Sequence, residues 1–128
     1  MTLRRRAWTA FRSLLAVLLA FAAVFAVNLL GSWLAAWLVL PAGGSPRLAW
    51  DLLWVVLSGI AGAWVAVRSA PCTPRGHALA FLLLMLAMDT AAVVRMGADF
   101  PLWFSAGLLL TLPLQVWLGM RLALGRSR

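Results

Sequence analysis

The only cysteine and the only histidine of this chain, Cys72 and His77, stand five residues apart in a short segment between two long apolar runs. A structural zinc site takes about four protein ligands and a catalytic site about three, while haem attachment requires a Cys-x-x-Cys-His motif. Two ligands complete none of these sites, and a single cysteine cannot form a disulfide within the chain. We therefore predict no cofactor, with Cys72 in a reducing cytoplasmic turn and His77 in the first turn of the next helix.

Asp89 is the residue best placed for chemistry inside a membrane, because it lies within the apolar run from Ala78 to Val94. A carboxylate at the centre of a spanning helix costs about 2.5–3.5 kcal/mol on insertion scales, so such residues usually face protein or water and often have a function. Asn28 and Gln115, in the first and last apolar runs, are its candidate partners across helices. Two interpretations stay open: a structural carboxylate that packs inward, or an ion or proton site formed by these three residues.

The composition of the chain indicates that these residues lie in a bilayer. Of its 128 residues, 65% are hydrophobic and 11% are charged, whereas a soluble domain is about 45–50% apolar and ~25% charged. About 20 apolar residues suffice for a helix to cross a hydrocarbon core of ~30 Å. The sequence has four such runs, at Leu14–Leu40, Leu48–Val67, Ala78–Val94 and Leu102–Met120.

We predict an all-α fold: an integral membrane four-helix bundle with up-down-up-down connections. It forms a single transmembrane domain over residues 1–128, with spans at about 14–38, 48–67, 77–95 and 102–121. The helices are predicted near 10–40, 46–69, 74–96 and 101–124. Ser45-Pro46 and Thr73-Pro74 are typical helix starts, in which the hydroxyl accepts an unpaired N–H and proline has none to satisfy. Pro113 is predicted to kink the last helix.

The distribution of the eleven arginines predicts the topology. With the N-terminus inside, nine lie on the inner side and two, Arg47 and Arg95, on the outer side. Both termini are therefore expected in the cytoplasm, and the first apolar run, which continues to Leu40, is expected to be an uncleaved anchor. Because the arginines mark the ends of apolar runs and do not follow one face, we predict no nucleic-acid partner. The nine inner residues are Arg4, Arg5, Arg6, Arg12, Arg68, Arg75, Arg121, Arg126 and Arg128.

Small residues recur at intervals of four in the second apolar run. Side chains of this size let another helix backbone approach closely. The face predicts a helix contact within the bundle, or with a second copy of the chain or another membrane protein. It consists of Ser58, Gly59, Gly62, Ala63 and Ala66.

Three segments resemble a group of small four-span bacterial inner-membrane proteins without an assigned function. They are "GIAGAWVAVRSAPCTPRGHALAFLLL", "DFPLWF" and "LPLQVWLG", within residues 59–119. In that group a small-residue helix ends in Ala-Pro, and x-x-Pro with His-Ala opens the next helix. The resemblance implies an inner-membrane location and carries no activity or functional residue with it.

The short connections leave no room for a soluble catalytic domain, so we predict that the chain is not an enzyme. The leading hypothesis is a non-enzymatic accessory or interaction component of the bacterial inner membrane, whose partners are the bilayer and other membrane proteins. The alternative is a small oligomeric channel or transporter that uses Asp89 with Asn28 and Gln115.

Overall fold

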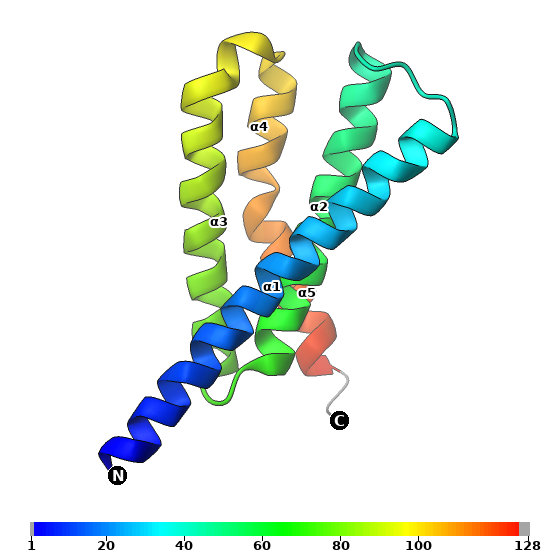
Figure 1. Ribbon diagram of the computed structural model, residues 1–128. Helices are drawn as coiled ribbons and strands as arrows, with labels where there is room; N and C mark the ends of the chain where they lie inside the picture. The colour runs from blue at the N-terminus through cyan, green and yellow to red at the C-terminus, as the bar shows by residue number, and fades with distance from the viewer. Residues whose placement is uncertain (1, 126–128) are drawn as a thin grey trace.

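The computed structural model describes residues 2–125, and this part of the chain consists of helices and short connections, without strands (Figure 1). Four segments are long and apolar enough to cross a membrane, which confirms the prediction of an all-helical chain with four apolar helices. Arg126 and Arg128, which entered the predicted topology, lie outside the described residues. The elements are α1 (Leu3–Trp37), α2 (Ser45–Ser69), α3 (Pro74–Met96), the 3-10 turn η1 (Gly97–Asp99), α4 (Leu102–Leu110) and α5 (Leu112–Gly125).

The helix starts differ from the predicted ones in their caps. α1 begins at Leu3, well before residue 10, because the Thr2 hydroxyl accepts the Arg5 N–H at 3.4 Å. Proline does occupy the first turn of α2 and of α3, but the predicted hydroxyl caps are wrong. The cap of α2 is Gly44, which places Ser45 inside the helix. Thr73 precedes α3 in a left-handed conformation with φ of 37°, and its hydroxyl donates to Cys72 Sγ at 3.9 Å.

The last apolar segment is interrupted at Thr111, which separates α4 from α5. Pro113 follows two residues later and has no N–H to donate to the carbonyl of the preceding turn. The Thr111 hydroxyl donates to the Gly107 carbonyl, and the Gln115 N–H reaches the Thr111 carbonyl at 2.8 Å. The helix is therefore interrupted two residues before Pro113 and one turn ahead of Gln115, in the stretch where the kink was predicted.

Helix α2 lies at the centre of the fold, where it contacts α1, α3, α4 and α5. Helix α1 crosses α2 obliquely, and its N-terminal part extends past the ends of the other helices (Figure 1). Small side chains dominate the buried core, so the helices meet through close backbone approach. The core cluster consists of Ala20, Ala63, Ala66, Val67, Ala78, Phe81, Met85, Leu112, Val116 and Ala123.

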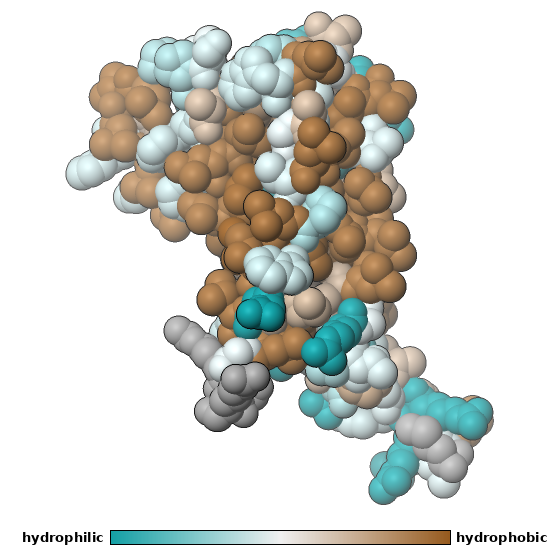
Figure 2. All heavy atoms as spheres, turned by 180° about the vertical axis from the view of Figure 1, so that it is seen from behind, coloured by the Kyte–Doolittle hydropathy of each residue, from teal (hydrophilic) through white to brown (hydrophobic). Residues whose placement is uncertain are grey.

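The arginines divide between the two ends of the molecule. The start of α1, the connection between α2 and α3 and the end of α5 lie at the same end (Figure 1). Most hydrophilic side chains on the face seen in Figure 2 gather there, while the rest of that face is largely hydrophobic. Arg47 and Arg95 belong to the opposite end, at the start of α2 and the end of α3. The arginines at the first end are Arg4, Arg5, Arg6, Arg12, Arg68, Arg75 and Arg121.

Candidate functional site

A polar contact joins α1 to the middle of α2. The Asn28 amide is half-buried, and its Nδ2 donates to Ser58 Oγ at 3.1 Å and to the Val24 carbonyl at 3.1 Å. Ser58 is fully buried, and its hydroxyl donates a hydrogen bond to the Val55 carbonyl at 2.7 Å. Both amide protons of Asn28 and the serine hydroxyl are thereby satisfied in a region where an unpaired donor would be costly.

A second polar contact lies next to the first along α2, where α5 packs. Gln115 is fully buried, and its Nε2 donates to Thr111 Oγ1 at 2.9 Å. Its carbonyl oxygen, Oε1, is buried and has no hydrogen-bond partner among the described residues. This oxygen lies against Gly59, at a place that any Cβ on that residue would occupy. Gln115 therefore fits only because residue 59 has no side chain.

Asp89 stands apart from both contacts. It is half-buried on α3, and its Oδ2 is buried without a hydrogen-bond partner in the described part of the chain. Asn28 bonds to Ser58 and Gln115 bonds to Thr111, so neither amide is bonded to Asp89. The structure thus brings Asn28 and Gln115 to consecutive residues of α2, Ser58 and Gly59, and does not assemble the three predicted residues into one hydrogen-bonded group.

The small-residue face of α2 is buried inside the chain, against three different helices. A Cβ on Gly62 would lie 2.6 Å from the Phe81 ring of α3 and 2.6 Å from a Val24 methyl group of α1. Ala63 meets Gly119 of α5, where the Cβ separation would be 2.6 Å. Ser58, Ala63 and Ala66 have no exposed surface. The helix contacts expected of this face are thus made within the chain.

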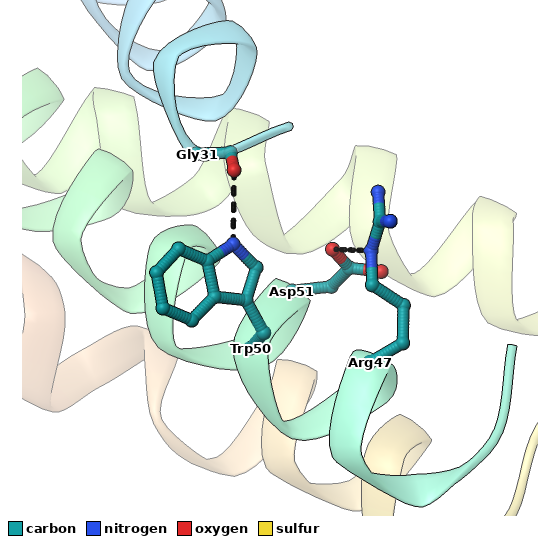
Figure 3. Close-up of polar contacts among 4 residues, drawn as sticks. All are labelled: Gly31, Arg47, Trp50 and Asp51. Carbon is teal, nitrogen blue, oxygen red and sulfur yellow. Dashed lines mark hydrogen bonds and ion pairs between the residues drawn. The ribbon is translucent and has the colours of Figure 1, made fainter. Parts of the chain in front are cut away.

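A contact between α1 and α2 that was not predicted from the sequence involves Gly31 and two tryptophans of α2, Trp50 and Trp54. The Trp50 indole N–H donates to the Gly31 carbonyl at 2.9 Å (Figure 3), and a Cβ on Gly31 would lie 2.6 Å from the Trp54 ring. In the same turn of α2, Arg47 pairs with Asp51 at 3.1 Å (Figure 3). A glycine inside an apolar run is the signal that could have indicated the contact.

Cys72 and His77 differ in their surroundings. Cys72 is exposed, whereas His77 is 8% exposed and its Nδ1 lies 3.1 Å from the Thr73 carbonyl. Because a carbonyl only accepts, this bond requires the proton on Nδ1. Within the described residues, no group of three or more His, Cys, Asp and Glu side chains comes together.

Comparisons with protein-family models, with curated proteins and with solved structures give no match to this chain. The geometry of the chain itself therefore carries the functional argument.

Proposed function

We propose that this chain is a multi-pass protein of the bacterial inner membrane whose four helices cross in alternating directions, with both termini in the cytoplasm. The positive-inside rule supports this orientation, because Arg47 and Arg95 are the only arginines of the described part at one end of the molecule and seven lie at the other. We further propose that its role is non-enzymatic, as an accessory or interaction component that binds another membrane protein.

The observation that carries the interaction role is the sparse packing of α1. In the most apolar stretch of 18 residues of this helix, only 17% is buried, the smallest share among the four long segments. Its buried residues, Ala16, Ala20, Gly31 and Ala35, face one side, and large apolar side chains cover the rest of its surface. A spanning helix of another protein could lie along this surface without displacing any helix of the bundle. The exposed side chains include Leu14, Leu15, Leu18, Leu19, Phe25, Leu29, Leu30, Trp33 and Trp37.

A photocrosslinking amino acid introduced at Leu18 of α1 tests this role in native membranes. The matched control is Leu83 of α3, since both side chains are 56% exposed. We expect a discrete adduct to one membrane protein from position 18 and only lipid adducts from position 83, identified by mass spectrometry. Lipid adducts alone from both positions would contradict the interaction role.

Asp89 supports a second candidate, a small oligomeric channel or transporter. Its buried Oδ2 is without a hydrogen-bond partner among the described residues, and a carboxylate in a spanning helix is often functional. We expect, on this hypothesis, that liposomes containing the wild-type chain conduct protons or cations, and that Asp89→Asn lowers the flux about ten-fold or more. Asp51→Asn, which removes a carboxylate paired with Arg47, is the control and should leave the flux unchanged. Liposomes as tight with the wild-type chain as without it would exclude this candidate.

A further inference from the structure

An open hollow of about 600 Å³ lies where the start of α3 meets the end of α5. Its volume is in the range of small-molecule sites, about 300–1,000 Å³. Charged and apolar groups share its wall. The residues that line it are Arg75, Trp117, Met120, Arg121, Leu124 and Gly125.

The two arginines of this hollow come from different helices, and neither forms an ion pair with another described residue. Arg75 lies in the first turn of α3, and Arg121 lies on α5 with its guanidinium 5.3 Å from the centre of the Trp117 ring. In the described part of the chain, the single ion pair joins Arg47 to Asp51 at the opposite end of the molecule. The guanidinium groups of the hollow are therefore available to an anion from outside the chain.

The start of α3 adds to the positive potential at this place. The first N–H groups of a helix have no partner within it and bear a partial positive charge. Here Thr73 makes no side-chain cap, so its hydroxyl does not satisfy the N–H groups of Arg75 and Gly76. This partial charge has the same sign as the two guanidinium groups.

The apolar part of the wall suits a ligand with a hydrocarbon portion. Trp117, Met120 and Leu124 form this part, next to the charged groups. At the same end of the molecule the Arg68 guanidinium lies 5.7 Å from the centre of the Trp64 ring. Tryptophan is enriched at headgroup level in membranes, and basic pockets between helices on the cytoplasmic side bind lipid phosphates.

We propose that this hollow is a binding site for a phosphate group, which Arg75 and Arg121 hold between them. A guanidinium group often binds a phosphate through two parallel, charge-assisted N–H···O hydrogen bonds. The phosphate belongs to an anionic phospholipid headgroup or is free inorganic phosphate. The proposal depends on neither the interaction role nor the transport role.

The test uses the full chain purified in an uncharged detergent. Short-chain phosphatidylglycerol, short-chain phosphatidylcholine and inorganic phosphate are titrated separately, and binding is followed by native mass spectrometry and by the rise in Tm. We expect phosphatidylglycerol to bind and the double variant Arg75→Gln/Arg121→Gln to weaken its binding about ten-fold or more. The control is Arg5→Gln/Arg6→Gln, which removes the same charge at the same end and should change binding less than about two-fold.

The outcomes separate the sources of phosphate. Binding of phosphatidylglycerol without binding of inorganic phosphate assigns the site to lipid, and comparable binding of both assigns it to free phosphate. If Arg75→Gln/Arg121→Gln and Arg5→Gln/Arg6→Gln lose the same amount of phosphatidylglycerol binding, the proposal is overturned. The attraction would then depend only on net charge. Arg75→Lys/Arg121→Lys keeps the charge and the fold but lacks the planar fork, so binding intermediate between wild type and the Gln variant is expected. Wild-type binding that does not exceed that of phosphatidylcholine would also overturn the proposal.

Discussion

Gly119→Ala is expected to destabilise the chain by about 1–3 kcal/mol, the usual range for overpacking a close contact. The added Cβ would overlap the Ile60 carbonyl oxygen and lie 2.6 Å from Ala63 Cβ and 3.0 Å from the Trp64 nitrogen. Two of these three groups are backbone atoms of α2, which cannot rotate away as a side chain can. The whole of α5 must therefore move outward from α2, and the contacts between these two helices weaken together.

Unfolding by sodium dodecyl sulfate titrated into a mild detergent, followed by circular dichroism, measures this change. Gly125→Ala is the matched control on the same helix, because a Cβ at that position meets no atom of the described residues within 4 Å. Alanine has a higher helix propensity than glycine by about 0.5–1 kcal/mol in a helix interior, so the control should be neutral or slightly stabilising. A Gly119→Ala variant as stable as the control would show that α2 and α5 are not in the close contact described.

The four apolar helices were predictable because lipid places such a strong demand on sequence. A spanning segment must be long, apolar and helical, since every backbone group has to be satisfied within the segment. The same physics made the small-residue face of α2 visible, because Ser58, Gly59 and Gly62 repeat at helical spacing. The structure buries all three of these residues against other helices.

The partners of that face could not be predicted, because helical periodicity identifies a face and not what covers it. Gly59 meets α5 and Gly62 meets both α1 and α3, a division that depends on how each helix is rotated and crossed. For the same reason, sequence alone could not show that Asn28 bonds to Ser58 and that neither Asn28 nor Gln115 bonds to Asp89. The side-chain hydrogen bond predicted for Thr73 at the start of α3 is absent, because this residue adopts a left-handed conformation that its residue type does not indicate.

Close approach has a particular importance in this chain. Between helices in lipid the hydrophobic effect supplies no net attraction, so packing and hydrogen bonds must provide the stability. Helix α2 makes both at one level, on faces about 100° apart: Ser58 receives Asn28 from α1, and Gly59 receives the Gln115 side chain from α5. The two polar contacts thus connect α2 to α1 and to α5.

Gly59→Ala is expected to destabilise the chain by about 2 kcal/mol through Gln115 alone. The new Cβ would overlap Gln115 Oε1 and lie 2.7 Å from its Cδ. Gln115 is fully buried, so its amide must swing aside and lose the bond from Nε2 to Thr111 Oγ1 at 2.9 Å. Gln115→Ala removes the obstructing group. The double variant Gly59→Ala/Gln115→Ala should therefore lose less unfolding free energy than the two single variants lose together, by about 1 kcal/mol or more.

The same detergent titration measures this coupling, and Gly62→Ala provides its control. The three atoms nearest a Cβ on Gly62 belong to Phe81 and Val24, whereas those nearest a Cβ on Gly59 all belong to Gln115. Gly62→Ala and Gln115→Ala should therefore add within about 0.5 kcal/mol, as independent sites do. If Gly59→Ala and Gln115→Ala also add within that margin, the glutamine does not occupy the space over Gly59. Coupling between Gly59→Ala and Gln115→Ala, without coupling between Gly62→Ala and Gln115→Ala, would establish that the Gln115 side chain fills the space over Gly59. Gln115 would then contribute to the packing of α5 against α2.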